Sequence, residues 1–520
     1  MMVGCVAAVS YVRLGSVLRS PAHPRLQNCK PQWTMRCMQQ QKEENTCAQM
    51  MVRAFREASA TPLPLLRQVA DAMTAEMYNG LASEGGSQQL KMLPAYVENL
   101  PTGEEEGLYY AVDLGGTNFR VLRVLLGGKQ GRILKQEFEE VAIPPALMLS
   151  TSRELFDFIA HEVVKFIAKE SDDFKPHSSD AREIGFAFSF PVLQTSVRSG
   201  VVIHWTKGFK IDDAIGKDIV AAFQESIGQL GKRIEIAALV NDTVGTLAQG
   251  HYFNTNTMVG VILGTGTNAC YIEQADAVPK WKGTIPASGQ MVINLEWGNF
   301  RSPYLPRTFA DEEVDRDSVN PGDQWFEKMI SGLYLGEIVR CMLVKIATDA
   351  ALFGGSVPLQ LLKPFSLPTP AISKMHSDDS PELKLVEIVL EDIFEIKNST
   401  LEERKIVHEL CGIIAERGGR LAAAGIVGIL QKIGRAGSRN NGTPVPNKVT
   451  VVAIDGGLYE HHAQYRAHMH AAIVELLGEN AAQSVVIELS KDGSGIGTAL
   501  LAASHSQHAK WHKQAESLTN

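Results

Sequence analysis

Two glycine-rich turns and one acidic tripeptide are the parts of this sequence best suited to chemistry. The turns lie in AVDLGGTNFRVLRV, which starts at Ala111, and in VGVILGTGTNACYI, which starts at Val259, and Asn241-Asp242-Thr243 lies between them. In each segment an apolar run ends in glycines, which permit positive φ and let backbone N–H groups face an anion. A second apolar, β-branched run follows each turn, which predicts a hairpin and not a P-loop. The arrangement predicts an ATP-dependent phosphotransferase.

Asp242 is the candidate general base of such a reaction. Transfer of a γ-phosphoryl group to an alcohol needs in-line placement, a metal that offsets the phosphate charge and a base for the hydroxyl proton. Asp242 follows the apolar run from Ile236 to Val240, where a strand end would project the carboxylate into a cleft. The pattern alone equally allows the tripeptide to turn the chain or to cap a following helix.

Residues of both turns are placed to bind the nucleotide. Asp113, at the end of the first predicted strand, is the expected partner of Mg²⁺, reached through water because magnesium gives up its hydration reluctantly. The phosphates of ATP would then meet both turns, at Gly115, Gly116, Thr117, Asn118, Gly264, Thr265 and Gly266.

The composition describes a large folded chain that acts on a small molecule. Its 520 residues are 45% hydrophobic, which suffices for two domains with a sizeable core. The net charge of −8, without basic clusters in the body of the chain, argues against a nucleic-acid partner. Seven cysteines form no CxxC pair, as expected of reduced core thiols. No segment has the length and apolar character of a transmembrane helix.

The amino-terminal segment 1–42 differs in composition from the rest of the chain. It contains no Asp or Glu, and Ser and Pro are interspersed with six basic residues: Arg13, Arg19, Arg25, Lys30, Arg36 and Lys42. This composition predicts an organelle transit peptide, with the plastid stroma as the expected destination and the mitochondrion or cytoplasm as alternatives. A disordered tail is the other interpretation of the same segment.

The predicted elements alternate between helices and strands. Thr151 with Glu154 offers a capping box for one helix. Long helices are predicted over residues 326–347 and 401–432, the second interrupted at Gly418-Gly419. The two glycine turns suggest two related halves, each a sheet with helices around it, that face one another across a cleft.

Seven motifs in order over roughly residues 55 to 505 resemble those of hexokinases, most closely the hexokinases of plants. They are Asp113-Leu-Gly-Gly-Thr-Asn-Phe-Arg120, Phe188-Ser-Phe-Pro191, Trp205-Thr-Lys-Gly-Phe209, Val240-Asn-Asp-Thr-Val-Gly245, Leu263-Gly-Thr-Gly-Thr-Asn268, Asn294-Leu-Glu-Trp-Gly298 and Asp492-Gly-Ser-Gly495. The resemblance implies an α/β, two-domain actin-like ATPase (ribonuclease H-like) fold with an interdomain cleft. It also implies ATP and Mg²⁺ as cofactors and the 6-hydroxyl of a hexose as the acceptor: glucose, with fructose and mannose as further substrates.

The same resemblance implies how the chain is divided. Residues 51–108 would form a helical segment that packs on the large domain. The small domain would comprise residues 109–240, completed by 488–505, and the large domain residues 241–487. The protein is expected to be a monomer, with regulatory proteins as further partners.

The resemblance also assigns the sugar pocket. Because a hexose is a ring of hydroxyls, its pocket needs amides, hydroxyls and carboxylates. Asp242 would be the base, and Lys207 would lie close to the reacting oxygen and phosphate. An exposed carboxylate in the first turn of a helix is the alternative for Glu327, which rests on a shorter match. The positions that would hold the sugar are Ser189, Thr206, Lys207, Asn241, Asn268, Glu296 and Glu327.

Two glycine motifs near the carboxyl terminus complete the expected nucleotide site. By resemblance, Gly493, Ser494 and Gly495 open a helix near the adenosine. Asp455-Gly-Gly457 also follows an apolar strand, and both a functional role and a tight turn stay open for Asp455.

Two residues depart from the pattern of the family. Gln249 stands where relatives usually have a small residue, and Gln290 where they often have Glu. The leading alternative to an active kinase is therefore a catalytically weak or inactive hexokinase-like sugar sensor or regulatory protein. An ATPase chaperone of the seventy-kilodalton heat-shock class would share the fold but would not need the sugar-pocket motifs.

Overall fold

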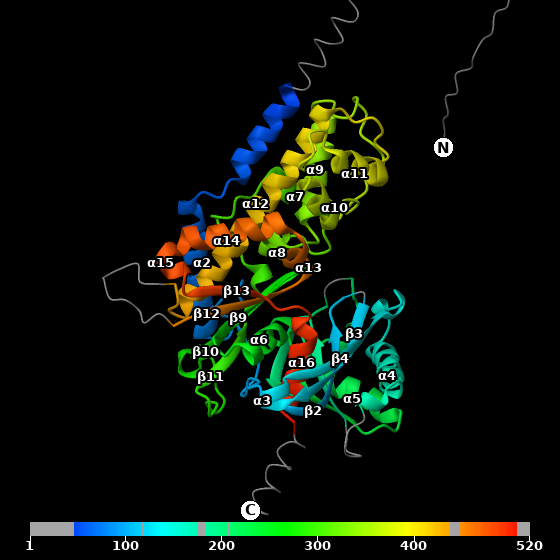
Figure 1. Cartoon of the computed structure of the whole chain (residues 1–520), viewed down its shortest axis with the longest axis vertical. Coiled ribbons are helices and arrows are strands. Elements are labelled where there is room, and N and C mark those ends of the chain that lie inside the picture. The colour runs from blue at the N-terminus through cyan, green and yellow to red at the C-terminus, as the bar shows by residue number, and fades with distance from the viewer. Residues whose placement is uncertain (1–45, 117, 175–181, 206–207, 437–447, 507–520) are drawn as a thin grey trace, which may run out of the picture.

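The chain folds around two β-sheets that lie side by side (Figure 1). The computed structural model describes residues 46–116, 118–174, 182–205, 208–436 and 448–506. A five-stranded sheet lies at the lower right of the view, and a six-stranded sheet lies to its left beneath a stack of long helices. The expected mixed α/β architecture is therefore confirmed.

The five-stranded sheet carries the first glycine turn. Its order is β4 (Ile133–Ala142), β3 (Asn118–Gly127), β2 (Glu106–Leu114), β5 (Arg182–Phe188) and β8 (Ile234–Val240). β2, β3 and β4 pair antiparallel, and β5 and β8 continue the sheet parallel to β2. The central strand β2 is buried over most of its length, whereas the edge strand β4 alternates between partly buried and exposed positions.

The six-stranded sheet carries the second glycine turn. Its order is β1 (Leu93–Pro94), β11 (Gln290–Asn294), β10 (Thr267–Gln274), β9 (Thr257–Leu263), β12 (Thr450–Asp455) and β13 (Val485–Leu489). β9, β10 and β11 pair antiparallel, and β12 and β13 continue parallel to β9. A separate two-stranded sheet pairs β6 (Val192–Ser196) with β7 (Ser199–Val202).

The two large sheets repeat one topology. In each, a hairpin with a third antiparallel strand is followed by two parallel strands added on the other side of the first strand. β2, β3, β4, β5 and β8 thus correspond to β9, β10, β11, β12 and β13. The prediction of two hairpins in two related halves is confirmed.

Helices cover both faces of the smaller sheet. α4 (Ser152–Ala168) begins at the predicted capping box of Thr151 and Glu154, and with α5 (Ile219–Gln229) it packs on one face. α16 (Gly493–Ser504) packs on the opposite face, against β2, β5 and β8. A carboxyl-terminal helix thus completes a sheet built from the first half of the chain.

Two helices cross in backbone contact between the sheets. α6 (Asp242–Phe253) packs on the six-stranded sheet and against α16. A Cβ atom on Gly497 would lie 1.7 Å from the carbonyl oxygen of Gly245, and one on Gly245 would lie 2.4 Å from that of Ser494. No side chain fits at either position, so the close approach itself requires glycine.

The remaining helices build the large body and its hydrophobic core. A helix over residues 46–59 and α2 (Leu63–Ala82) lie beside the long helix α12, and α3 (Gly128–Gly131) is a short turn beside β3. The others are α7 (Phe309–Asp317), α8 (Trp325–Ile330), α9 (Leu335–Asp349), α10 (Thr369–His376), α11 (Lys384–Phe394), α12 (Leu401–Lys432), α13 (Gly457–His461), α14 (Ala463–Leu477) and α15 (Glu479–Ala482).

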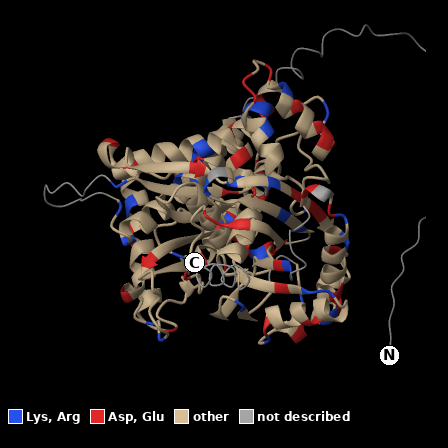
Figure 2. Cartoon of the chain, turned by 60° about the horizontal axis from the view of Figure 1, so that its bottom comes forward, with Lys and Arg blue, Asp and Glu red and all other residues tan. Residues whose placement is uncertain are grey.

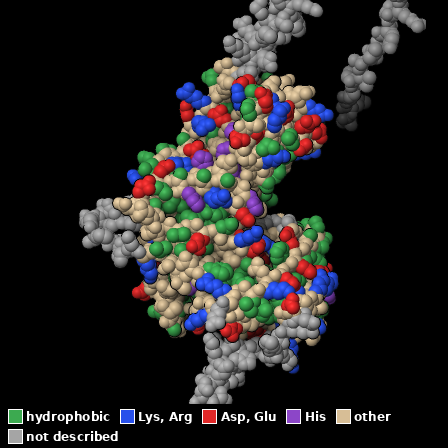
Figure 3. All heavy atoms as spheres, viewed as in Figure 1, with side chains coloured by type: hydrophobic (Ala, Val, Ile, Leu, Met, Phe, Trp, Pro, Cys, Tyr) green, Lys and Arg blue, Asp and Glu red, His purple; other side chains and the backbone are tan. Residues whose placement is uncertain are grey.

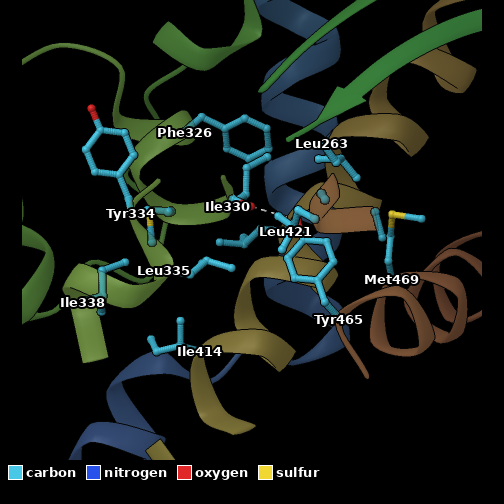
Figure 4. Packing of buried hydrophobic residues seen from close by; sticks show 14 of the residues in the cluster. Leu263, Phe326, Ile330, Tyr334, Leu335, Ile338, Ile414, Leu421, Tyr465 and Met469 are labelled. Carbon is cyan, nitrogen blue, oxygen red and sulfur yellow. Dashed lines mark hydrogen bonds between the residues drawn. The ribbon is translucent and has the colours of Figure 1, made fainter. Parts of the chain in front are cut away.

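The single helix predicted over residues 326–347 is wrong, because the chain breaks between α8 and α9. Figure 4 shows the Tyr465 hydroxyl donating to the carbonyl of Ile330, the last residue of α8, at 3.0 Å. Within the break, the N–H of Gly332 donates to the carbonyl of Gly264 (2.8 Å), and that of Leu333 to the carbonyl of Thr265 (2.9 Å). In a continuous helix these two N–H groups would donate to carbonyls of the helix itself. Because the helix is broken, they donate to the second glycine turn instead.

The predicted interruption at Gly418-Gly419 is also wrong, since α12 runs through it. A Cβ on residue 418 would lie 2.9 Å from the Tyr465 ring, and one on residue 419 would lie 2.5 Å from the Tyr465 carbonyl oxygen. The two glycines let α14 approach, and this packing outweighs their low helix propensity.

Acidic and basic residues are interspersed along the ribbon of both bodies (Figure 2). In the part of the chain that the structure describes, no helix combines the length and apolarity required to cross a bilayer.

Candidate active site

The candidate catalytic residues follow strands whose carboxyl ends meet at one edge of the smaller sheet. Leu114 of β2 pairs with Phe188 of β5, and Ala187 of β5 pairs with Val240 of β8. The residues after these strands therefore lie next to one another along the edge, which is where open α/β sheets bind ligands. They include Gly115, Ser189 and Asn241. In Figure 3 the outline of the molecule is indented between its upper and lower parts.

Asn241 and Asp242 start helix α6. The Asn241 side chain caps the helix by accepting from the Thr243 N–H (3.1 Å) and the Thr243 hydroxyl (2.7 Å). Asp242 is the first helical residue and is partly exposed, with Oδ1 accepting from the Thr243 N–H at 2.8 Å. The capping interpretation thus holds for Asn241, and it leaves the second carboxylate oxygen of Asp242 at the strand edge.

A chain of hydrogen-bonded amides and a carboxylate extends from Asn241 across the larger sheet. Asn268, nearly buried, donates from Nδ2 to Oδ1 of Asn241 (3.2 Å), Oδ1 of Asn294 (2.8 Å) and Oε1 of Glu296 (3.4 Å). Asn294 donates to the same Glu296 oxygen at 2.9 Å. Three predicted sugar residues therefore form one cluster with Asn294, beside Asp242.

Glu296 is held in an unfavourable backbone conformation. Its φ of 56° and ψ of 49° lie in the left-handed region, which costs a residue with a Cβ about 1–2 kcal/mol. The amides of Asn268 and Asn294 fix its carboxylate in this position. Such outliers persist where surrounding contacts over-determine them, and they are concentrated at ligand sites.

Glu327 reaches the same region from α8. Its Oε2 accepts from the Thr267 N–H at 2.9 Å, one residue before Asn268. A Cβ on Gly266 would lie 2.7 Å from this oxygen, so the glycine makes room for the carboxylate. The partly buried Glu327 is therefore bound to the second turn, and the alternative of an exposed carboxylate is wrong.

Carboxylates from both bodies surround Arg120. The nearly buried Asp113 and the partly buried Asp455 lie close enough for their charges to interact. Burial, with a further contribution from Asp113, raises the pKa of Asp455 to about 6. Burial lowers the pKa of Arg120, but the charges of Asp113, Asp492 and Asp455 outweigh this effect and raise it. Nη1 of Arg120 donates to Oδ1 of Asp492 at 2.9 Å. This set of oxygens suits Mg²⁺, which usually binds one or two carboxylates plus substrate phosphates.

The amino-terminal end of α16 points into the same region. The N–H of Ser494 donates to Oδ2 of Asp455 at 3.1 Å. The Ser494 hydroxyl is buried and has no hydrogen-bond partner among the described residues. The first N–H groups of a helix, together with a free hydroxyl, make an anion site. Gly493, Ser494 and Gly495 open helix α16, as expected, and their place near the adenosine stays a prediction.

Although glycine permits positive φ, the structure does not use this freedom at Gly115, Gly116, Gly264 and Gly266. A close contact explains the glycine at position 266, where a Cβ would lie 2.7 Å from Oε2 of Glu327, whereas a Cβ on Gly264 would make only an ordinary contact with the Cα of Gly456 at 3.7 Å. Asn118 is exposed and donates to Glu140 on β4. Three predicted residues lie outside the described part of the chain: Thr117, Thr206 and Lys207.

Sequence reasoning missed the contributions of Asn294 and Arg120. Both occur within the motifs that carried the resemblance, yet neither was assigned a role. A useful signal was available for Asn294, because an amide at the end of the apolar run 291–293 would be exposed at a strand edge. The pairing of Arg120 with Asp492 joins residues 372 positions apart and has no local signal.

Comparison with known proteins agrees with this geometry. The protein family described as Hexokinase matches residues 51–252 and 258–504. Hexokinase-1 of Arabidopsis thaliana is 57% identical over 456 residues, covering 88% of this chain and 91% of that protein. Hexokinase-1 of Spinacia oleracea is 57% identical over 448 residues, covering 86% and 89%.

Solved structures give the same result. The hexokinase of Schistosoma mansoni in complex with glucose superposes with a TM-score of 0.78 at 32% identity, over 88% of this chain and 99% of that one. A second hexokinase crystal structure gives a TM-score of 0.73 at 30% identity, with the same coverage. The predicted two-domain fold is therefore confirmed, and the chain belongs to the hexokinase family, the enzymes that phosphorylate hexoses.

Proposed function

We propose that this enzyme transfers the γ-phosphoryl group of ATP to the 6-hydroxyl of a hexose, with Asp242 as the general base. Glucose is the proposed substrate, with fructose and mannose as further acceptors. The observation that carries the proposal is the hydrogen-bonded cluster of Asn241, Asn268, Asn294 and Glu296 directly beside Asp242. It offers amide and carboxylate groups that can both donate to and accept from sugar hydroxyls.

The sugar would bind between this cluster and the edge of the smaller sheet. Glu327 and Glu296 would accept hydrogen bonds from ring hydroxyls, and Ser189 would contact the sugar from the other side. The partly exposed Asp242 would accept the proton of the reacting hydroxyl, since a base must lie within hydrogen-bonding reach of that proton. Thr206 and Lys207 remain predicted sugar contacts.

The triphosphate would lie against the turns that converge from both halves. Asp113 and Asp455 would hold Mg²⁺ directly or through water, and bound Mg²⁺ offsets the charge of the phosphates. The N–H groups at the start of α16 and the free hydroxyl of Ser494 would bind phosphate oxygens. Gly115, Gly116, Thr117 and Asn118 would meet the phosphates from the first turn, and Gly264, Thr265 and Gly266 from the second.

The test uses purified protein with Mg·ATP and glucose, measured for glucose 6-phosphate. Asp242→Ala should lower kcat by about 10²–10⁴, the usual contribution of a general base. Glucose affinity, measured by calorimetry, should remain near that of the wild type. The matched control is Asp392→Ala, an exposed position on α11.

Three results would contradict the proposal. Undiminished turnover in the Asp242→Ala variant would exclude Asp242 as the base. Glucose binding by the wild type without any product would favour the sugar-sensor alternative, and ATP hydrolysis indifferent to sugar would favour the chaperone-like one.

We further propose that residues 1–42 direct the protein to the plastid, on the strength of their basic, acid-free composition. A fluorescent protein fused to residues 1–60 should accumulate in the plastid stroma. Accumulation in mitochondria or in the cytoplasm would overturn this proposal.

A further inference from the structure

The turn that leads from β13 into α16 is held by a side chain from another helix. Gln249 lies in α6, two turns after Asp242, and only 6% of it is exposed. Its Nε2 donates to the carbonyl of Lys491 at 3.1 Å, and its Oε1 accepts from the hydroxyl of Ser490. Both ends of the buried amide are therefore satisfied by consecutive residues of the same turn.

The fit between Gln249 and this turn leaves no spare room. A Cβ on Gly493 would lie 2.4 Å from the Ser490 hydroxyl and 3.0 Å from Oε1 of Gln249. The turn thus packs directly on the amide. A long polar side chain that is buried, hydrogen-bonded at both ends of its amide and closely packed holds one conformation, because a change of rotamer would leave these polar groups without partners.

The turn held by Gln249 carries the groups proposed to receive the phosphates. Asp492 follows Lys491 in the left-handed conformation, with φ of 54°, and pairs with Arg120. Ser494 comes two residues later, bonded through its N–H to Asp455 and with a hydroxyl that has no hydrogen-bond partner among the described residues. A shift in the Ser490–Lys491 backbone would therefore move both Asp492 and the first N–H groups of α16.

Gln249 and Asp242 belong to one rigid helix. α6 continues without interruption from Asp242 to Phe253, and its contact with α16 through Gly245 and Gly497 leaves no space for adjustment. Asp242, the proposed base for the sugar hydroxyl, thus lies in the first turn of α6. The start of α16, which is proposed to bind the phosphates, is held by later turns of the same helix.

We propose that Gln249 is a positioning residue, which holds the start of α16 and hence the ATP phosphates in register with Asp242. The inference rests on the proposed function, since it requires ATP at the start of α16. It gives a role to a position at which this chain departs from the small residue that is usual in its relatives.

The main test is Gln249→Met, which keeps the volume and removes both hydrogen bonds. We expect the kcat/KM for Mg·ATP to fall by about tenfold, as for the loss of about 1.4 kcal/mol of interaction. The dissociation constant for glucose should stay unchanged, because the sugar cluster makes no contact with the turn. Ser490→Ala, which removes one of the two bonds, should show the same pattern with a smaller loss.

Gln224→Met is the matched control. Gln224 lies on α5, where its amide also bonds the backbone at both ends, to the carbonyl of Ile234 (2.8 Å) and from the N–H of Ile236 (3.0 Å). This variant should lower Tm without changing kcat/KM for Mg·ATP. If Gln249→Met lowers Tm alone, or weakens glucose and Mg·ATP equally, Gln249 has only a structural role and the proposal fails.

Binding of a fluorescent ATP analogue with Mg²⁺ separates this inference from the proposed function. If the wild type makes no product, the kinase proposal fails, and weaker analogue binding by Gln249→Met would still support the positioning role. If the Gln249→Met protein does not fold, Ser490→Ala decides: unchanged kcat/KM for Mg·ATP in that variant overturns the inference.

Discussion

The two glycine turns share one topology but differ in what surrounds them. A Cβ on Gly116, in the first turn, would have no heavy atom within 4 Å, and one on Gly115 would only reach atoms at 4.0 Å. The second turn is enclosed: Gly332 and Leu333 donate to its carbonyls, and Glu327 occupies the place of a Gly266 side chain. Among the described residues, the first turn is open and the second is packed.

Glycine is therefore needed in the two turns for two different physical reasons. Glycine in the first turn leaves space at the sheet edge, as a closely approaching phosphate would need. Glycine in the second turn leaves space for protein atoms, above all the carboxylate of Glu327. Repeated motifs in related halves therefore need not repeat their roles, and substitutions in the two turns should affect different properties.

The largest expected effect concerns Asp455, whose neighbour Gly456 packs on the second turn. Burial raises the pKa of Asp455 to about 6. The folded state therefore binds this proton more tightly than the unfolded chain, and the free energy of unfolding falls as pH rises from about 4 to about 6. The carboxyl can account for up to about 3 kcal/mol of that fall, at 1.36 kcal/mol per pKa unit.

Urea unfolding of the ligand-free protein in EDTA checks this expectation. The wild type should lose stability relative to Asp455→Asn as the pH rises through this window, and the difference should level off above it. Asp392→Asn, at an exposed position, controls for the general pH dependence. A difference that does not vary with pH would mean that the enclosure of the second turn does not perturb Asp455.

A smaller effect is expected from Gly266→Ala in the packed turn. The added methyl group would lie 2.7 Å from Oε2 of Glu327, and the flexible carboxylate would move away and lose its bond to the Thr267 N–H. We expect KM for glucose to rise by about 10–100-fold, since hydrogen bonds to charged groups contribute about 1.5–3 kcal/mol. KM for Mg·ATP should change less. Equal losses for both substrates would contradict separate roles for the two turns.

The smallest effect is expected from Gly116→Ala in the open turn. Nothing in the described structure lies near the added methyl group and the backbone φ is not positive, so Tm should match that of the wild type. A methyl group in the way of a phosphate should raise KM for Mg·ATP about fivefold, as for roughly 1 kcal/mol. An unchanged KM for both substrates would show that the space beside Gly116 is not used by the nucleotide.

Local signals in the sequence predicted the fold well where contacts are local. The hairpins at both glycine turns and the capping box of Thr151 and Glu154 depend on residues a few positions apart, and all three are confirmed. The two long helices were predicted less well because Tyr465 acts on both. Its ring and backbone fill the space beside Gly418-Gly419, and its hydroxyl donates a hydrogen bond to the carbonyl of the last residue of α8.

The same limit applies to the candidate site. Asn241 and Asn268 were predicted from the resemblance to hexokinase motifs, and only Asn241 also follows an apolar run, Ile236 to Val240. The partners of Gln249 and Arg120 are more than two hundred positions away in the sequence, so no spacing could indicate them. The sequence alone does not show which strand ends lie next to one another, because that depends on the topology of the sheets.

The position of α16 has a consequence for how the protein is made. The smaller sheet is complete by Val240, yet one of its faces stays bare until the ribosome has added the last helix, which begins at Gly493. Throughout that interval of translation, apolar side chains on β2 and β3 must be shielded by other means, because uncovered apolar surface invites aggregation. We expect the nascent chain to depend on chaperones until its final residues emerge.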